Sequence, residues 1–203
     1  MRLFDRSPIA FGAYGLAALL AVFELAVLLQ ALHPQVSDNY RAYYIDRTNT
    51  CLSQPVTGEY TLGTEINFRS GGPNTRELRP CGWDGPAGDG MHSIGETSRL
   101  LFDVGAAQPL SLMLELTGVS LEGPPVQHVD VSANGVALGT LEVTPGRTDR
   151  FTTAVPAAVI DGAGKLTIQL DFPDAIDPSK GRVSNTHWRA VKLSAASVTP
   201  TSK

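Results

Sequence analysis

The sequence has few of the residues on which most enzymatic and nucleic-acid sites depend. Its 203 residues include 4 histidines and 2 cysteines, and 16 Lys and Arg against 20 Asp and Glu give a net charge of -4. This balance excludes the basic field that nucleic-acid binding requires. No serine stands in a G-x-S-x-G elbow, and no glycine-rich phosphate loop follows a strand and opens a helix. The sequence patterns of hydrolase nucleophiles and of nucleotide sites are therefore both missing.

Helix-type periodicity is also scarce after residue 48, whereas 20 glycines and 14 prolines supply turns, a composition typical of strands joined by turns. Candidate strands are Leu62–Phe68, Arg99–Val104, Leu110–Leu116, Val129–Ala133, Val136–Val143, Phe151–Val155, Leu166–Phe172 and Val191–Leu193, with a period-2 pattern in the Leu110 and Leu166 segments. Asn134-Gly135 between two of these segments predicts a tight hairpin. At least seven strands predict an all-β fold, an antiparallel β-sandwich of jelly-roll type.

One long hydrophobic run, Ile9–Leu32, precedes the predicted strands and is interrupted only by Glu24 and Gln30. A helix of about 20 apolar residues crosses a hydrocarbon core of about 30 Å. Because a cleaved signal peptide has an apolar region of only about 7–15 residues, the run predicts a retained anchor. Arg2 and Arg6 before it predict a cytoplasmic N-terminus and a periplasmic C-terminal domain on the bacterial inner membrane.

Polar groups in and after this run suggest a contact with a membrane protein. Glu24 is expected either to meet a polar group on a partner's transmembrane helix or to be a protonated or snorkelling carboxyl that the apolar residues outweigh. Pro34 ends the helix, and Tyr40, Tyr43 and Tyr44 then share one face of a short helix. These tyrosines suit either an interfacial linker or a docking surface for a membrane partner.

The two cysteines, Cys51 and Cys81, are expected to form a disulfide in an oxidising compartment. Closing their loop would stabilise the domain by about 3–4 kcal/mol in the chain-entropy model. No other Cys or His lies at ligand spacing from either cysteine, so neither a metal nor a cofactor is predicted.

The predicted organisation has five parts. They are a cytoplasmic N-terminus (1–8), a transmembrane helix (9–32), a juxtamembrane linker (33–50), an extracytoplasmic β-sandwich (51–198) and a tail (199–203).

Several short motifs between about residues 80 and 195 resemble a β-sandwich domain, similar to carbohydrate-binding modules, that accompanies bacterial membrane glycosyltransferases and exopolysaccharide machinery. The motifs are Gly82-Trp83, Gly90–Gly95, Arg99–Phe102, Val129–Val131 with Asn134-Gly135, Phe172-Pro173 through Asp177-Pro178, and Gly181–Ser184. That family tends to carry an aromatic residue where His92 stands and an acidic residue near Ala87. This chain lacks the glycosyltransferase itself, so the resemblance implies a stand-alone accessory protein.

Glycan binding would use aromatic faces together with planar polar side chains, because a pyranose ring offers an apolar face and a rim of hydroxyls. Trp83 and Trp188 are the candidate platforms, and core packing is the competing interpretation of each. Hydrogen-bonding candidates near them are Asp84, His92, Arg99, His187 and Arg189.

A catalytic carboxylate pair could be drawn from Asp84, Asp89 and Glu96. All three lie in one glycine-rich segment, where acidic residues more often cap turns, and this favours a non-catalytic protein. Three hypotheses follow. The first is a single-pass accessory subunit of an envelope or exopolysaccharide synthesis or export system, with a glycan- or partner-binding sandwich and a glycosyltransferase as one candidate partner. The second is a free-standing membrane-tethered carbohydrate-binding module, and the third is a surface enzyme that uses Asp84 and Glu96.

Overall fold

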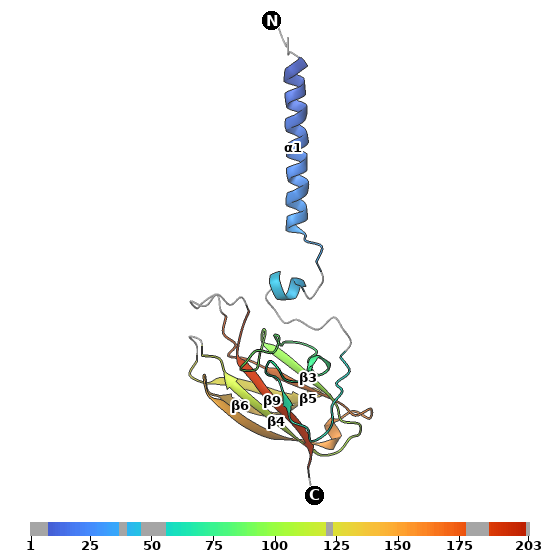
Figure 1. The fold of residues 1–203 in the computed structure, drawn as a ribbon, viewed down its shortest axis with the longest axis vertical. Coiled ribbons are helices and arrows are strands. Elements are labelled where there is room, and N and C mark those ends of the chain that lie inside the picture. The colour runs from blue at the N-terminus through green and yellow to red at the C-terminus, as the bar shows by residue number, and fades with distance from the viewer. Residues whose placement is uncertain (1–7, 37–39, 46–55, 121–123, 178–186, 202–203) are drawn as a thin grey trace. The chain divides into compact units, whose positions relative to one another are not determined.

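The computed structural model describes residues 8–36, 40–45, 56–120, 124–177 and 187–201 (Figure 1). The chain divides into two compact units, Met1–Ser37 and Asp38–Lys203. The first unit contains the helix α1 (Pro8–Leu32), and the second contains an antiparallel β-sandwich.

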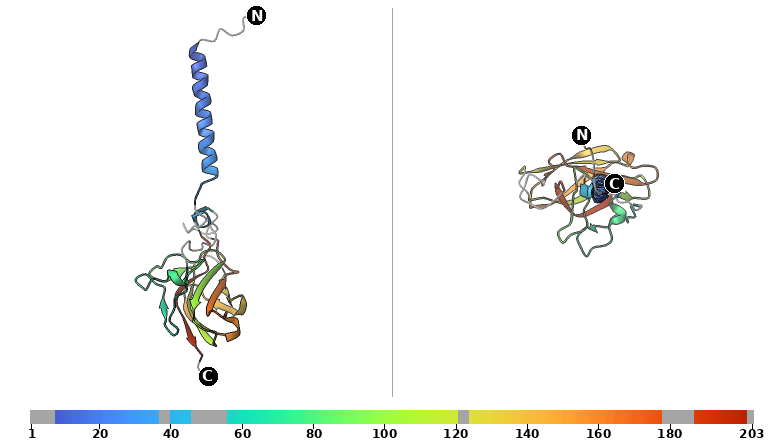
Figure 2. Two further views of the ribbon diagram at one scale, coloured as in Figure 1. Left: turned by 90° about the vertical axis from the view of Figure 1, so that its right-hand side faces the viewer. Right: turned by 90° about the horizontal axis from the view of Figure 1, so that it is seen from above.

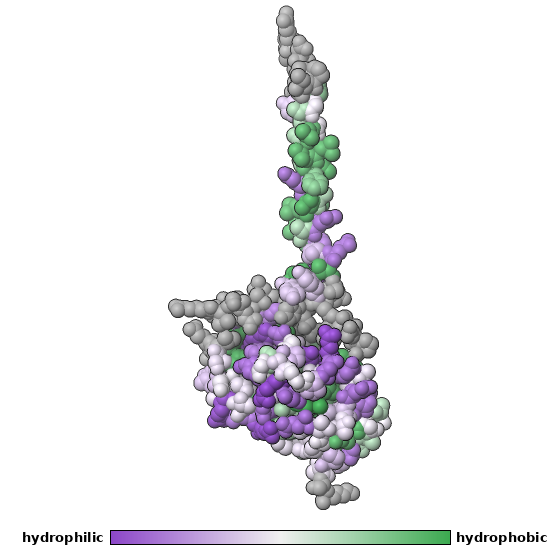
Figure 3. Space-filling model, in the orientation of Figure 1, coloured by the Kyte–Doolittle hydropathy of each residue, from purple (hydrophilic) through white to green (hydrophobic). Residues whose placement is uncertain are grey.

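The helix α1 is long and apolar enough to cross a membrane, as the sequence predicts. Its segment Phe11–Leu32 has a mean hydropathy of 2.2, and Figure 3 shows hydrophobic residues along most of it. Proline suits the first turn of a helix, because an N–H at that position would have no partner within the helix, and α1 begins at Pro8. Glu24 lies within this apolar segment.

A short π-helical turn, η1 (Arg41–Ile45), follows in the second unit. The rings of Tyr40 and Tyr44 contact each other, with centroids 4.6 Å apart and planes tilted by 37°. These two rings therefore share a face, as the sequence predicts. The side chain of Tyr43 lies outside the described part of the chain.

Two antiparallel sheets form the sandwich (Figures 1 and 2). Sheet A has the order β3 (Thr97–Asp103), β8 (Lys165–Asp171), β5 (Gln127–Ala133) and β6 (Val136–Val143). Sheet B has the order β1 (Ile66–Asn67), β9 (Val191–Pro200), β4 (Leu110–Gly118) and β7 (Thr148–Val155), and β2 (Met91–His92) also pairs with β9. Between β3 and β9 the chain changes sheet at every connection except β5–β6, which is typical of a jelly roll. Two 3-10 turns, η2 (Arg76–Leu78) and η3 (Ala157–Val159), lie in the connections.

The core fills the space between the sheets through strict alternation along the strands. Leu110, Leu112, Leu114 and Leu116 of β4 are buried, and the intervening side chains face outward. The predicted hairpin is confirmed, because Asn134 (φ 45°) and Gly135 (φ 83°) both adopt the positive φ of a tight turn. The Asn134 side chain also accepts a hydrogen bond from the N–H of Thr167 at 2.8 Å, which ties the hairpin to β8.

Three details of the predicted strands are wrong. The segment predicted at Leu62–Phe68 pairs only at Ile66 and Asn67, because Gly63 turns the chain with a φ of 85°. The last strand, predicted at Val191–Leu193, continues to Pro200, and Thr199 and Pro200 of β9 still pair with β4. The two-residue strand β2 is too short to show periodicity in the sequence.

Two predictions fall partly outside the described residues. Cys51 lies there, so the Cys51–Cys81 disulfide stays a prediction. The segment Gly181–Ser184, which resembles the closing loop of the related domains, lies there as well.

Candidate functional site

The structure places Trp83 in the core. Its side chain is 6% exposed and belongs to the main hydrophobic cluster. The indole Nε1 donates a hydrogen bond to the carbonyl oxygen of Arg99 at 2.8 Å. Core packing is therefore the correct interpretation of this tryptophan, and it has no open face on which a sugar ring could stack.

Arg189 and Asp84, two other predicted sugar ligands, bind each other. The Arg189 side chain is 6% exposed, its Nη2 lies 2.9 Å from the Asp84 carboxylate, and its Nη1 donates to the Ser93 carbonyl at 3.0 Å. Arg79 donates from Nη1 to the backbone carbonyl of Asp84 at 2.6 Å. These bonds join the segments on either side of β2 to the start of β9, so the pair is structural.

Burial and charged neighbours shift the pKa values of Asp84 and of the nearby His92. Burial alone would raise the pKa of Asp84, but the hydrogen bond and charge of Arg189 outweigh it and lower the pKa. Burial lowers the pKa of His92, and the cations Arg189 and Lys192 lower it further. His92 is therefore neutral at pH 7. Lys192 forms a salt bridge with the exposed Asp89.

The remaining predicted sugar ligands do not assemble into one groove. His187 is 1% exposed, whereas Trp188 is only partly buried. Arg99 is exposed on β3 of sheet A, where its Nε donates to Gln169 at 2.9 Å. The structure thus brings Asp84, His92 and Arg189 together and leaves Arg99 on the other sheet.

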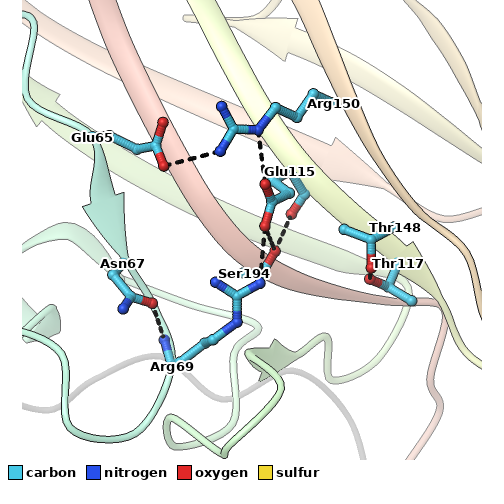
Figure 4. A network of polar contacts seen from close by, with 8 residues as sticks. All are labelled: Glu65, Asn67, Arg69, Glu115, Thr117, Thr148, Arg150 and Ser194. Carbon is cyan, nitrogen blue, oxygen red and sulfur yellow. Dashed lines mark hydrogen bonds and ion pairs between the residues drawn. The ribbon is translucent and has the colours of Figure 1, made fainter.

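A second polar cluster, which sequence reasoning did not single out, lies on the outer face of sheet B (Figure 4). We call it the Glu115 face and define it by Glu65, Arg69, Glu115, Arg150 and Ser194. Oε1 of Glu115 accepts hydrogen bonds from Arg69 Nη2 at 2.9 Å and from Ser194 Oγ at 2.6 Å. Oε2 accepts from Arg150 Nε at 2.8 Å, and Arg150 Nη2 reaches Glu65 at 3.1 Å.

Glu115 acts as a fixed anion at the centre of this face. Its side chain is 12% exposed, while those of Arg69 and Arg150 are 40% and 57% exposed. The hydrogen bonds from Ser194 and then Arg150 lower the pKa of Glu115 to about 2. The carboxylate therefore stays ionised and holds two guanidinium groups that keep exposed surface. Thr117 and Thr148, whose hydroxyls lie 2.6 Å apart, extend the polar surface along the strands.

A carboxylate pair suited to glycoside hydrolysis is not favoured by these contacts. A general acid in such a pair needs a raised pKa. The pKa values of Asp84 and Asp89, two of the three candidate carboxylates, are both lowered instead. Among the described residues there is also no group of three or more His, Cys, Asp or Glu that could hold a metal ion.

A histidine–carboxylate contact outside the Glu115 face makes one loop sensitive to pH. The ring Nδ1 and the backbone N–H of His128 both contact Asp174, which lies in the connection after β8. The hydrogen bond to the Asp174 carboxylate raises the pKa of His128 above its ordinary value of 6.5. The ion pair between His128 and Asp174 is fully formed below pH 6.5 and is lost as pH rises through the raised pKa of His128.

We expect a histidine NMR titration of the full chain to give His128 a pKa above 6.5. In an Asp174→Asn variant the pKa should fall back toward 6.5, because the neutral amide does not stabilise the imidazolium. The signals of the other histidines serve as the internal control. Equal His128 pKa values in the parent and the variant would contradict the contact.

The comparisons with known proteins concern the fold. No protein-family model and no curated protein matches the chain. A CBM36-1 domain of a multidomain xylanase from the hindgut metagenome of Trinervitermes trinervoides aligns with 69% of this chain and 98% of its own length, at 12% identity and a TM-score of 0.40. A family 35 carbohydrate-binding module from an environmental isolate covers 75% and 97%, at 13% identity and a TM-score of 0.37.

The xylan-binding CBM22-2 domain of Paenibacillus barcinonensis Xyn10C covers 68% of this chain and 99% of its own, at 13% identity and a TM-score of 0.43. All three are carbohydrate-binding modules. Identities and TM-scores this low transfer neither a ligand nor a site to this chain.

Proposed function

We propose that the β-sandwich binds a glycan through the Glu115 face and that the protein is a non-catalytic, membrane-anchored accessory subunit. The observation that carries the proposal is the fixed Glu115 carboxylate, which holds the half-exposed Arg69 and Arg150 side chains on an open sheet. Donors that are already oriented lose little conformational freedom when a ligand binds. Planar guanidinium groups can donate to two neighbouring hydroxyls of a sugar ring at once.

The charge of the face bears on the kind of glycan. Glu65 and Glu115 balance Arg69 and Arg150, and the whole chain carries a net charge of -4. A neutral glycan meets no long-range repulsion from such a surface, whereas a polyanionic glycan does. Of the residues singled out from the sequence, His92, Arg99 and Trp188 keep exposed surface and remain candidates for peripheral sugar contacts.

A binding measurement on the full chain in lipid nanodiscs tests this proposal, because nanodiscs avoid detergents with sugar headgroups. We expect a neutral oligosaccharide from a glycan array to bind, and Arg150→Ala to weaken binding about 10-fold or more through loss of a charged donor. Arg147→Ala removes another exposed arginine, which pairs with Asp149, and is the matched control. Absence of glycan binding by the parent, or equal affinities of the two variants, would contradict the proposal.

The membrane part of the proposal rests on Glu24. A simple tether does not need an ionisable group within the span, and such a group costs about 2.5–3.5 kcal/mol on insertion scales unless it meets a polar partner. We propose that Glu24 contacts the transmembrane helix of a partner, such as a glycosyltransferase of an envelope or exopolysaccharide system. The exposed Tyr40–Tyr44 pair, with Tyr43, would add a docking surface for the same partner. In this arrangement the chain spans the bacterial inner membrane, with its sandwich in the periplasm.

Co-purification of partners with the tagged full chain tests this contact. We expect Glu24→Leu to reduce recovery of the partner several-fold, because the polar contact within the membrane is lost. Gln30→Leu removes the other polar residue of the apolar segment and should leave recovery unchanged. Equal recovery with Glu24→Leu and the parent would mean that α1 is a tether only.

A further inference from the structure

A cavity of about 420 Å³ lies apart from the Glu115 face, between residues 59–62 and residues 103–105. Two backbone hydrogen bonds hold its base, from Gly58 N–H to the Glu77 carbonyl at 2.6 Å and from Asp103 N–H to the Gly58 carbonyl at 2.7 Å. Its volume falls within the range of about 300–1,000 Å³ that is typical of small-molecule sites. None of the five residues that define the Glu115 face lines it.

The aromatic wall of the cavity is rigid. The Tyr60 hydroxyl donates to the Thr64 carbonyl at 2.6 Å and accepts from the N–H of Val198 at 2.9 Å. Its ring packs edge-on against the buried Phe102, with centroids 5.0 Å apart and an interplanar angle of 76°. The partly buried Leu62 adds apolar surface beside it, with the buried Val104 behind.

The polar wall is also held in place. Asp103 pairs with Lys165 Nζ at 2.7 Å and accepts from the Gly105 N–H at 3.1 Å, while Lys165 also donates to the Thr57 carbonyl at 2.9 Å. These contacts lower the pKa of Asp103, with the Lys165 hydrogen bond as the main cause. The exposed Glu59 supplies a second carboxylate at the cavity.

We propose that this cavity is a second glycan subsite and that it binds a neutral sugar unit. The inference rests on the proposed glycan-binding function and names the sugar class. Tyr60 and Leu62 match the apolar face of a pyranose ring, and the carboxylates of Glu59 and Asp103 accept hydrogen bonds from its hydroxyls. Two carboxylates against one ammonium group, that of Lys165, give the cavity a net negative charge, which repels a uronate.

Isothermal titration of the full chain in nanodiscs tests the subsite with cellotriose and mannotriose as neutral probes and trigalacturonate as the anionic probe. Thr61 is exposed and lines the cavity, so Thr61→Trp fills the cavity without removing a core contact. Ala158→Trp, at an exposed position of η3, is the matched control. We expect Thr61→Trp to weaken binding of a neutral probe at least 10-fold, Ala158→Trp to leave it unchanged, and trigalacturonate not to bind.

The Arg150→Ala variant separates this inference from the proposed function. Weakening by both Thr61→Trp and Arg150→Ala supports two subsites on one glycan. If Arg150→Ala weakens binding but Thr61→Trp binds with the affinity of the parent, the cavity inference is overturned. The Glu115 face then remains the proposed glycan site. If trigalacturonate binds to the parent and Thr61→Trp abolishes that binding, the inference that the cavity takes a neutral sugar is overturned. If no probe binds to the parent chain, the cavity inference fails together with the proposed function.

Discussion

An Asp84→Ala variant is expected to lose about 3 kcal/mol of its free energy of unfolding, because it leaves a buried guanidinium without its carboxylate. Arg189 is 6% exposed, and its Nη2 donates to Asp84 at 2.9 Å. The Ser93 carbonyl accepts from Nη1 and is unchanged by the substitution, so the variant removes the carboxylate at Nη2 only. Urea denaturation of the full chain in nanodiscs, followed by tryptophan fluorescence, measures the change.

Two further variants show whether burial of the arginine is the cause. Asp89→Ala breaks an exposed pair with Lys192 and should cost less than about 1 kcal/mol. A double variant, Asp84→Leu with Arg189→Met, removes both charges and should be more stable than Asp84→Ala, because no buried charge is left. If Asp84→Ala is as stable as Asp89→Ala, Asp84 is not a structural anchor and becomes a candidate glycan ligand again.

A Glu115→Gln variant is expected both to destabilise the sandwich and to weaken glycan binding. The neutral amide keeps the shape of Glu115 but loses charge-assisted hydrogen bonds to Arg69 and Arg150, each worth about 1.5–3 kcal/mol at most before solvent screening. Because both arginines are 40% exposed or more, we expect a net loss of about 1–2 kcal/mol. Freed arginines must also be ordered again by the ligand, so affinity should fall about 10-fold.

The pH dependence of stability identifies Glu115 as the group responsible. Its pKa is about 2 in the folded chain, against an ordinary value of 4.5 for a glutamate. A carboxyl whose pKa is lowered by folding contributes its full stability above pH 4.5 and loses it as pH falls toward 2. The parent should therefore lose more stability across this interval than Glu115→Gln does. Parallel curves for the two proteins would show that the carboxylate is not held as the structure indicates.

The sequence predicted most of the fold because β-sandwich strands carry a period-2 pattern that is local. Leu110–Leu116 alternates strictly, and the structure buries that series of leucines. Asn134-Gly135 likewise specifies its own turn through positive φ at both residues. The boundaries of β1 and β2 escaped prediction because two-residue strands are defined by their pairing with β9, which no local pattern records.

The candidate site was harder to predict because its contacts join distant parts of the chain. Alternation in β4 alone places Glu115 on the outward face, but its partners Arg69, Arg150 and Ser194 lie 46, 35 and 79 residues away. The two interpretations of Trp83 could not be separated for a related reason. The isolated bridge between Trp83 and Ser93, which no local pattern records, accompanies the packing of this indole in the core.

Hydrogen-exchange mass spectrometry of the full chain in nanodiscs, with and without a bound neutral oligosaccharide, tests the central claim most directly. The account predicts slower exchange in peptides that cover β4, β7 and β9 around Glu115, Arg150 and Ser194, and a smaller change in the Arg150→Ala variant at the same glycan concentration. Unchanged exchange in these strands when the parent is saturated with glycan would contradict a binding site on the Glu115 face.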